Sequence, residues 1–444
     1  MANTSNSWAV VGGGLMGLTI AWRLAKAGKP VVLFEASDTL GGLASPWKFE
    51  DLVWDRHYHV TLLSDSNTRR ILNELDLEQQ MRWVTTKTGF SANGELVSMS
   101  NAVEYLRLPG MSMVDKIRVA GTIVLGSRVT DWRKLEQIPV EDWLTRYSGK
   151  TAFQRLWRPL LEAKLGDRWK DSSAAFIWAT IQRLYAARRT GLKREMFGYV
   201  PGGYSHVFRN FEQKLRAVGV EIRKQCPITA IRHKDGRNTV ETASGAFQFD
   251  RVVLTTTPKQ VSRLCPDLTT EERAAFGSVE YQGVVCASML LEKPLADYYL
   301  TYLTDDWVPF TAVVEMSAFV DPAEFGGRTL VYLPKYAGAG DPVFSRTDAE
   351  LRQTYEDALH RIYPHFAQNR VLAFQVSRVK EVFPIPRLGY SAHLPPIVTS
   401  LPGVVAVSSA HIVNGTLNVN DTLAVAERAS VSLLVNDGMR LYLD

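Results

Sequence analysis

The chain has 444 residues, of which 46% are hydrophobic and 22% are charged. Such a length suits two to four domains at about 100–200 residues each, and the composition excludes a disordered, collagen-like or disulfide-rich protein. The formal net charge of +5, from 51 Lys+Arg and 46 Asp+Glu, is too small and too dispersed to indicate a nucleic-acid partner.

The first predicted elements form a strand–helix–strand unit. Residues 8–11 are an apolar run that is typical of a buried parallel strand. Residues 15–27 carry apolar side chains at helical spacing, and Gly28 is expected to end this helix. Residues 31–34 predict the second strand.

A G-x-G-x-x-G turn at Gly12, Gly14 and Gly17 joins the first strand to the helix. The first glycine permits the tight turn, the second lets the backbone approach a pyrophosphate, and the third lets the helix pack close to the strand. The helix N-terminus offers a partial positive charge to phosphates. The turn predicts dinucleotide contacts from Gly12, Gly13, Gly14, Leu15, Met16 and Gly17.

Glu35 ends the second strand, eighteen residues after Gly17 and near the ~20 expected for a carboxylate that binds ribose hydroxyls. A carboxylate there repels a 2′-phosphate, which disfavours NADP and leaves FAD or NAD. We expect Ala36 and Ser37 to line the same ribose.

A second glycine pair, Gly41-Gly42, follows shortly after Glu35. This segment resembles the extended FAD fingerprint of the superfamily that contains amine oxidases, protoporphyrinogen oxidases and phytoene desaturases. The resemblance implies that residues 41–44 pass along a non-covalently bound FAD. Leu43 stands where the family usually has Arg, and Ala44 follows it.

Residues 54–59 resemble the D-x-G-x-H segment that lies beside the flavin in this superfamily. His57 replaces the glycine, and His59 holds the histidine position. The resemblance implies flavin contacts for His57, Tyr58 and His59, with His59 as a catalytic candidate. A surface or packing role for His57 is an equal alternative.

Residues 66–200 are predicted to be mostly helical, with helices over 67–74 and 114–127 and a hairpin over 88–98 that turns at 92–94. Residues 154–166 resemble a stretch of protoporphyrinogen-oxidase-like proteins. Lys164 within it is a catalytic candidate that would bind a substrate anion, with a surface lysine as the alternative. The densest basic stretch, residues 188–194, suits a solvated loop, an anionic substrate or a membrane surface.

Residues 199–258 are expected to return to the cofactor. A helix is predicted over 207–218, followed by strands. The resemblance implies that the backbone at Ile228 binds the adenine ring and that Thr255 and Thr256, at the end of a buried strand, lie near the cofactor.

Residues 276–380 alternate apolar and polar side chains, which predicts an antiparallel sheet for the substrate. Glu315 lies in an apolar run there. Because a buried carboxylate is costly unless it is paired, either a salt bridge or a functional site is expected, and Glu315 is our third catalytic candidate.

The last segment predicts a strand over 404–407 and a helix from about 422 to 434, with Asn420 or Asp421 as its N-cap. In the resembling family this helix points its positive end at the flavin, which implies cofactor contacts for Ser409, Asn418, Val419 and Asn420. No cysteine lies nearby, so we expect no covalent flavin link here. None of the three cysteines, Cys226, Cys265 and Cys286, has C-x-x-C spacing, so we expect no metal site.

The fold implied is α/β, a three-layer Rossmann-like FAD-binding domain built from discontinuous segments, plus an α+β substrate domain with a mixed sheet and a helical part. We expect the FAD-binding domain in residues 1–75, 196–275 and 381–444, and the substrate domain in residues 76–195 and 276–380.

The resemblance implies a FAD-dependent oxidoreductase that moves a hydride from a small organic substrate to flavin N5. The sequence lacks a second G-x-G-x-x-G in a strand–helix setting, so oxygen or a quinone-like acceptor is expected. Three alternatives stay open: a UDP-galactopyranose-mutase-like isomerase, a lipid-directed desaturase with an apolar docking patch, and a flavin-free protein like the Rab GDP-dissociation inhibitors. Free thiols and the lack of a signal sequence or of ~18 consecutive apolar residues predict a cytoplasmic protein, with peripheral membrane contact as a variant. The oligomeric state is not predicted.

Overall fold

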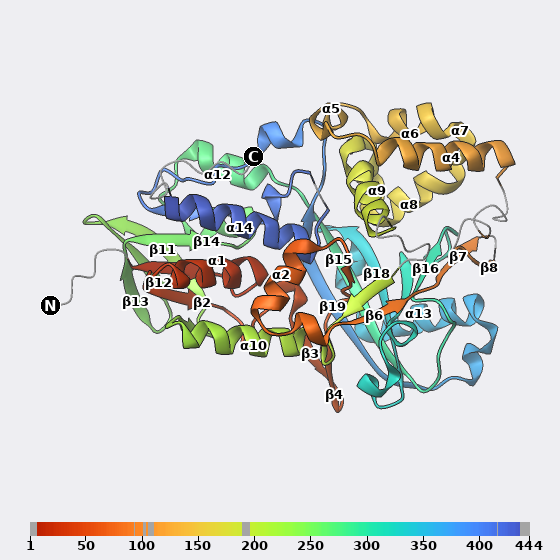
Figure 1. Cartoon of the computed structure of the whole chain (residues 1–444), viewed down its shortest axis with the longest axis horizontal. Coiled ribbons are helices and arrows are strands. Elements are labelled where there is room, and N and C mark those ends of the chain that lie inside the picture. The colour runs from red at the N-terminus through yellow and green to blue at the C-terminus, as the bar shows by residue number, and fades with distance from the viewer. Residues whose placement is uncertain are drawn as a thin grey trace.

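The computed structural model describes residues 7–92, 94–100, 104, 111–188, 196–414 and 416–435. The elements form two halves along the longest axis, one around a parallel sheet and one around a larger mixed sheet (Figure 1). We call them the parallel-sheet half and the mixed-sheet half.

The parallel sheet has the order β10-β2-β1-β14-β20, and all of its strands run parallel. Its strands come from three distant parts of the chain: β1 (Trp8–Val11), β2 (Val31–Phe34), β10 (Glu221–Arg223), β14 (Arg251–Leu254) and β20 (Val404–Ala406). Successive side chains alternate between two apolar clusters, one on each face, as expected when both faces of a sheet are covered.

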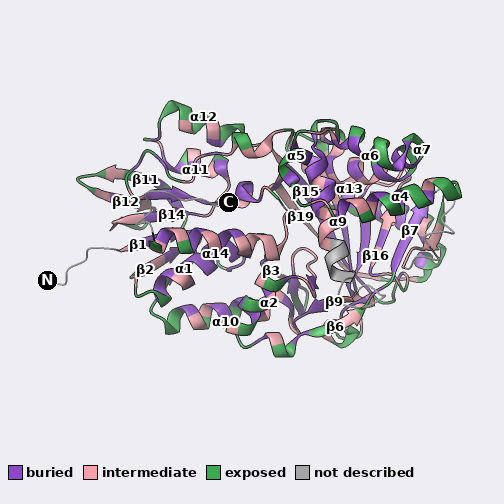
Figure 2. Ribbon diagram, turned by 45° about the horizontal axis from the view of Figure 1, so that its top comes forward, coloured by how far each residue is buried: buried purple, intermediate pink, exposed green. Residues whose placement is uncertain are grey.

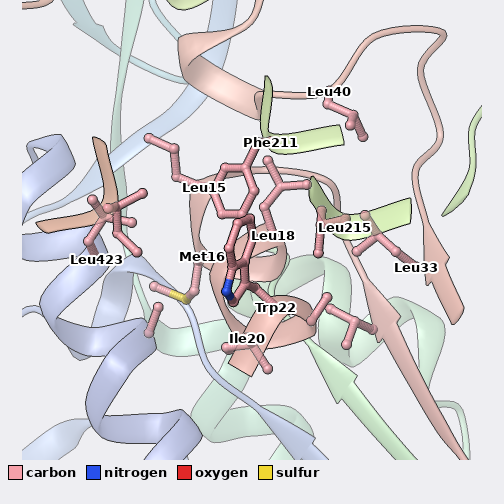
Figure 3. Close-up of a cluster of buried hydrophobic side chains, with 14 of the residues drawn as sticks. Leu15, Met16, Leu18, Ile20, Trp22, Leu33, Leu40, Phe211, Leu215 and Leu423 are labelled. Carbon is pink, nitrogen blue, oxygen red and sulfur yellow. The ribbon is translucent and has the colours of Figure 1, made fainter. Parts of the chain in front are cut away.

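One face of the parallel sheet is covered by α1 (Leu15–Lys26), α10 (Gly203–Ala217) and α14 (Val419–Val435). Figure 3 shows the core between them, where Trp22 of α1 meets Phe211 of α10 edge to face at a ring-centroid distance of 5.2 Å. Burying a large side chain of this kind stabilises the fold by roughly 1.5–3 kcal/mol.

The other face is covered by a three-stranded antiparallel sheet and two helices, which makes the third layer. These elements are β11 (Ile228–Lys234), β12 (Arg237–Thr242), β13 (Gly245–Phe249), α11 (Pro258–Leu264) and α12 (Thr270–Ser278). The helix α2 (Ser66–Glu74) packs beside α14.

The mixed sheet has the order β19-β15-β18-β17-β16-β7-β8, antiparallel except for the pair β16–β7. Its strands are β7 (Thr88–Ala92), β8 (Glu95–Ser98), β15 (Tyr281–Leu291), β16 (Leu300–Leu303), β17 (Ala312–Glu315), β18 (Thr329–Gly338) and β19 (Val371–Pro384). The helix α13 (Asp348–Ile362) covers one face. On the other face lie β3 (Pro46–Phe49), β4 (Leu52–Asp55), β5 (Thr61–Leu62), β6 (Arg82–Thr85) and β9 (Met196–Tyr199).

The helical part of this half packs around five buried tryptophans, Trp132, Trp143, Trp157, Trp169 and Trp178. It contains α4 (Met113–Gly126), α5 (Trp132–Glu136), α6 (Val140–Ser148), α7 (Lys150–Ala152), α8 (Arg158–Leu165) and α9 (Ala174–Arg188). Among the described residues, no helix has the length and apolar character needed to cross a bilayer.

The structure confirms the α/β fold with a parallel sheet of discontinuous strands and a mixed sheet, and it corrects several element bounds. The helix expected over 207–218 begins at Gly203, and the last helix begins at Val419, so the expected N-cap at Asn420 or Asp421 is wrong. The large sheet is mixed because β7, from the hairpin at 88–98, joins it parallel to β16. The hairpin's Asn93 and most of the basic stretch at 188–194 lie outside the described residues.

Candidate cofactor and substrate site

Two glycines of the opening turn are required by the packing of the chain itself. A Cβ on Gly17 would lie 1.9 Å from the carbonyl oxygen of Gly12, which is far inside contact distance. Gly12 has a φ of +108°, and a Cβ there would lie 2.7 Å from Oγ1 of Thr255. The helix α1 therefore packs on the turn at a distance that only glycine allows.

Gly14 is different, because the protein leaves space in front of it. Its φ is −74°, and a Cβ there would meet only the Cα of Gly42, at 3.9 Å. Gly14 is the N-cap of α1, no side chain caps this helix, and no acidic residue stands in its first turn. Leu15, Met16 and Gly17 thus begin a helix whose positive end faces open space, which fits an anionic group such as a diphosphate.

The Glu35 carboxylate lies at the same turn. Its Oε2 accepts a hydrogen bond from the Gly13 N–H at 2.6 Å, and Oε1 accepts from the N–H and the hydroxyl of Ser37, both at 2.8 Å. The backbone N–H of Cys226 donates to the Glu35 carbonyl, which brings the segment leading to Ile228 alongside Glu35 and Ala36. An acid at this position suits the hydroxyls of a ribose next to the diphosphate.

The second glycine pair packs directly against the first turn. The Gly41 N–H donates to the Gly13 carbonyl at 2.8 Å, and a Cβ on Gly42 would lie 3.3 Å from the Cα of Gly14. Gly41 has a φ of +122°, and a Cβ on it would collide with the Phe208 ring. The pair therefore starts the 3₁₀ turn of Gly42–Ala44 beside the open space at Gly14.

Two polar groups among the predicted cofactor residues are buried without a hydrogen-bond partner in the described part of the chain: the Thr256 hydroxyl and Nδ1 of His59. Buried polar groups in proteins are nearly always bonded. Thr255, beside Thr256, donates its hydroxyl to the Val11 carbonyl and so holds β14 against the turn. The two unbonded groups fit a site that a polar ligand completes.

The N-terminus of α14 carries the last predicted cofactor residues. Asn418 is its N-cap: Oδ1 of Asn418 accepts from the Asp421 N–H at 2.9 Å, and the amide group donates to the Asp421 carboxylate. The side chain of Asn420 instead caps α2, because its Oδ1 accepts from the Asn67 N–H at 2.9 Å. What Val419 and Asn420 offer to a ligand is therefore backbone N–H at the positive end of α14.

His57 connects the cofactor loop to the mixed sheet. Its Nδ1 is 3.0 Å from the Leu43 carbonyl, and its Nε2 is 3.1 Å from the Ser377 hydroxyl. Burial lowers the pKa of His57 to about 4, so the ring is neutral at physiological pH. The carbonyl then requires Nδ1 to donate, and Nε2 accepts from Ser377. Both ring nitrogens of His57 thus bond within the protein, and the flavin contact implied for this residue stays a prediction.

His59 forms a buried pair with Asp55, a residue that was not among the predicted site residues. Nδ1 of His59 lies 3.9 Å from Oδ2 of Asp55, whose Oδ1 accepts from the Tyr204 N–H at 2.8 Å. Burial lowers the pKa of His59 to about 4 and raises that of Asp55 to about 7. The imidazole is therefore neutral at pH 7, and the pair is not an ion pair. Both side chains line a small cavity with Tyr204, Thr61 and Met316.

Lys164 reaches the mixed sheet from α8. Its Nζ lies 3.6 Å from the centroid of the Tyr336 ring and 5.0 Å from that of Phe383. The Tyr336 hydroxyl is 3.0 Å from that of Tyr58. No acidic side chain among the described residues pairs with Lys164, so its charge is balanced by ring faces.

Glu315 forms no salt bridge with any described residue, although a salt bridge was one of the two expectations for it. Its carboxylate is 1% exposed and accepts hydrogen bonds from the N–H groups of Leu295 and Ala296, at 3.1 and 2.9 Å. Burial raises its pKa to about 7. Glu315 thus holds the chain after β15 in place through backbone amides. These bonds support a structural role, and the catalytic role stays a prediction.

A larger cavity lies where four parts of the chain meet. Its lining combines the end of α5, the start of α9, the end of β19 with the residues after it, and the segment before α14: Glu136, Ser173, Ala175, Phe176, Phe383, Pro384, Pro386, Tyr390, Ser409, Ile412, Val413, Thr416 and Leu417. Ser409 links this cavity to the predicted cofactor residues, and its hydroxyl is 3.1 Å from that of Tyr281. The other lining residues were not predicted, because nothing in the local sequence distinguishes them from ordinary core residues.

Comparison with known proteins gives this arrangement a family. The flavin containing amine oxidoreductase family matches residues 15–434. The chain is 26% identical to the carotenoid phi-ring synthase of Streptomyces griseus over 398 residues, 82% of this chain and 75% of that protein. It is 36% identical to the 15-cis-phytoene desaturase of Synechococcus elongatus over 76 residues, 17% of this chain and 16% of that protein.

The fold recurs in a solved structure from Exiguobacterium sp. 255-15, a protein provisionally named a protoporphyrinogen oxidase. It superposes with a TM-score of 0.77 at 19% identity and covers 97% of this chain and 99% of its own. At that identity the likeness establishes the fold, whereas the family match extends over nearly the whole chain. The chain belongs to the flavin-containing amine oxidoreductase family.

Proposed function

We propose that this chain binds FAD non-covalently and catalyses the oxidation of an organic substrate. The observation that carries the proposal is the open space in front of Gly14, at the uncapped N-terminus of α1, with the Glu35 carboxylate beside it. A diphosphate and a ribose would occupy these positions in a single dinucleotide.

The residues that would hold FAD come from all three segments of the parallel-sheet half. The turn at 12–17 and Glu35 would bind the diphosphate and one ribose, and the backbone at Ile228 would bind the adenine. Thr256 and Ser409 would offer hydroxyls to the rest of the cofactor. Burial raises the pKa of the Cys265 thiol to about 12, and burial also raises that of Cys286, which supports a non-covalent cofactor because the thiolate is the reactive form.

Bound flavin would supply the redox chemistry, since its N5 atom accepts a hydride from a substrate. The contribution of the chain is electrostatic and geometric. The backbone N–H groups of Val419 and Asn420 lie at the positive end of α14, where they would stabilise negative charge. His59, neutral at pH 7, presents an unbonded Nδ1 in a cavity with Asp55, which makes it our first candidate for a polar contact to the reacting groups.

We propose a substrate with an extended apolar skeleton, such as a polyene, and a desaturation or oxidation of its carbon chain. The cavity at Ser409 supports this class, because Phe176, Phe383, Ile412 and Leu417 form much of its wall. Relatives named as carotenoid enzymes support it as well. Lys164, over Tyr336 and next to Phe383, would bind an anionic end group if the substrate has one. Oxygen or a quinone-like molecule would reoxidise the flavin.

The cofactor assignment is tested by Glu35→Ala and Glu35→Gln. We expect both variants to lose FAD during purification and to bind it at least tenfold more weakly, since a hydrogen bond from a ribose hydroxyl to a charged group is worth about 1.5–3 kcal/mol. Thermal unfolding of the flavin-free forms, measured in parallel, separates this loss from the loss of the bonds to Gly13 and Ser37. Unchanged FAD affinity in both variants would refute the ribose assignment.

The reaction is tested under anaerobic conditions by mixing the oxidised holoenzyme with polyenes, amines, porphyrinogens and nucleotide sugars. Bleaching of the flavin absorbance by a polyene supports the proposal. Turnover that requires pre-reduced enzyme and gives no net oxidation would instead identify a redox-neutral isomerase.

A further inference from the structure

We propose that the exposed apolar face of α4 docks on the surface of an anionic lipid bilayer. The docking surface consists of Met113, Val114, Ile117 and Val124 of α4 together with Tyr147 of α6. None of these residues belongs to the candidate cofactor site, so the inference stands independently of the proposed function.

Exposed hydrophobic residues are concentrated at this surface. Met113, Val114 and Ile117 are 54%, 66% and 62% exposed, and Val124 and Tyr147 also rank among the exposed large hydrophobic residues. The other exposed large hydrophobic residues in the described ranges are scattered over both halves: Val53, Val218, Leu388, Val398, Val431 and Val435. Single exposed apolar residues are ordinary, whereas a contiguous patch marks an interaction site.

The helix α4 is apolar on two opposite faces. On the inner face, Val119 is 1% exposed, and Gly126 packs so closely on α9 that a Cβ would lie 3.3 Å from Ile181. On the outer face, positions 113, 117 and 124 recur at helical spacing with the small residues Ala120 and Gly121 between them. A surface helix usually has a polar face towards water. The outer face of α4 is apolar instead, which indicates that it contacts another apolar surface.

The charges at the edge of the patch are basic. The Arg118 side chain donates to the carbonyls of Tyr147 and Arg146, the Arg146 guanidinium lies 5.7 Å from the Tyr147 ring, and Lys150 is exposed one turn further on. The one acid in the first turn of α4, Asp115, is held by Ser112 in a capping box. The acids of α6, Glu141 and Asp142, stand in its first turn, away from Tyr147.

Apolar side chains with basic residues at their edge favour anionic lipid over the other partners that could cover the α4 face. Apolar side chains flanked by arginine and lysine are the features that place a helix in the interface of an anionic membrane. A second copy of the chain would bring the cations around Arg118 together, which disfavours self-association. Figure 2 shows α4 towards the end of the mixed-sheet half that lies away from the N-terminus.

Vesicle sedimentation of the full chain, in the state in which it purifies, tests the inference. The probes are sucrose-loaded vesicles of phosphatidylcholine alone and of phosphatidylcholine mixed with phosphatidylglycerol. We expect binding to the mixed vesicles that weakens with added salt, and at least tenfold weaker binding for the variant Val114→Glu/Ile117→Glu. The matched control is Val431→Glu, because Val431 on α14 is 60% exposed and lies outside the docking surface. This variant should bind the mixed vesicles as the wild type does.

Two further measurements keep the test decisive. Ile117→Gln adds no charge and should weaken binding in the same direction but less, which covers the case in which the double variant fails to fold. Light scattering without vesicles measures the molar mass of the wild type and of the α4 variants. We expect the same mass for all of them, so that no dimer depends on α4. The inference is overturned if the wild type does not sediment with the mixed vesicles, if the α4 variants bind as well as Val431→Glu does, or if those variants abolish a dimer rather than vesicle binding.

Discussion

The opening turn of the parallel-sheet half and the Lys164 contact of the mixed-sheet half are built in opposite ways. The turn uses backbone and glycines from one continuous segment, residues 12–17, with Glu35 close behind it. The Lys164 contact uses the rings of Tyr336 and Phe383, which the chain brings together from distant positions, and Tyr58 bonds the Tyr336 hydroxyl. A backbone site thus leaves a local sequence signature, whereas a side-chain site of this kind does not.

Gly17 and Gly14 of the turn give the most direct test of the backbone site. Gly17→Ala places a Cβ 1.9 Å from the Gly12 carbonyl, so we expect a loss of more than about 3 kcal/mol in the free energy of unfolding, or failure to fold. Gly14→Ala has room for its Cβ within the protein and should cost under ~1 kcal/mol, yet it should bind FAD at least tenfold more weakly. Urea unfolding of the flavin-free proteins and FAD titration measure both quantities.

The pair is informative because the two changes are chemically identical. If Gly14→Ala retains FAD as tightly as the wild type, the space in front of Gly14 does not receive the diphosphate. Equal stability losses for both variants would contradict the distinction between packing and ligand access.

Glu315 tests whether the buried acids of the mixed-sheet half are structural. Its folded pKa of about 7 exceeds its ordinary value of 4.5, so the folded state binds more protons between these values, and stability falls as pH rises from about 4.5 through about 7. Glu315→Gln should reduce the difference in unfolding free energy between pH 5 and pH 8 by about 3 kcal/mol. Denaturant unfolding at both pH values measures this.

The FAD content of Glu315→Gln is the control measurement. We expect the same FAD content as in the wild type, because Glu315 lies outside the candidate cofactor site. Asp55 at the end of β4, whose pKa burial raises from 3.8 to about 7, gives a pH dependence of the same sign. An unaltered pH profile in Glu315→Gln would show that the carboxylate is ionised at no cost in the folded protein.

Arg23 tests how the cofactor segments are held together. Its guanidinium bonds Glu74 of α2 and Glu427 of α14, and these two partners raise its pKa further above the ordinary value. Arg23→Gln should cost about 1–2 kcal/mol, less at high salt, because the group is partly exposed. Lys26→Gln, which removes an exposed partner of Glu74 at 3.4 Å, should change stability by under ~0.5 kcal/mol. Similar losses of unfolding free energy in Arg23→Gln and Lys26→Gln would contradict a specific role for Arg23 in joining α1, α2 and α14.

Lys164 should give the smallest change in stability. Lys164→Met retains an apolar contact with Tyr336, so we expect under ~1 kcal/mol in unfolding free energy and no change in FAD content. If Lys164 binds a substrate anion, KM for substrates with a carboxylate rises while neutral analogues are unaffected. Flavin reduction by matched anionic and neutral substrates tests this, and equal effects on both classes would assign Lys164 a packing role.

The elements of the parallel-sheet half could be predicted from the sequence because their signals are local. The strands at 8–11 and 31–34, the helix between them and the roles of Gly12 and Gly17 follow from apolar runs and glycine spacing. The N-cap at Asn418 was missed because three neighbouring polar residues, Asn418, Asn420 and Asp421, suit a cap equally well. Only the position of α2 determines that Asn420 caps a different helix.

The mixed-sheet half was less predictable for a physical reason. The parallel pairing of β7 with β16 joins residues some 200 positions apart, and no periodicity in either strand indicates its partner. The role of Glu315 depends in the same way on two amides that it reaches through the fold. The cavity at Phe176, Phe383 and Ser409 is formed by four segments, and none of them has a sequence that marks it as a cavity wall.

The central claim is that the opening turn of the chain holds a dinucleotide with a flavin. The most direct test is to denature the purified protein with acid, sediment it, and identify the flavin in each fraction. The account predicts about one FAD per chain, all of it released into the supernatant. A protein that contains no flavin and takes up none on incubation with FAD, or flavin that stays with the pellet, would contradict it.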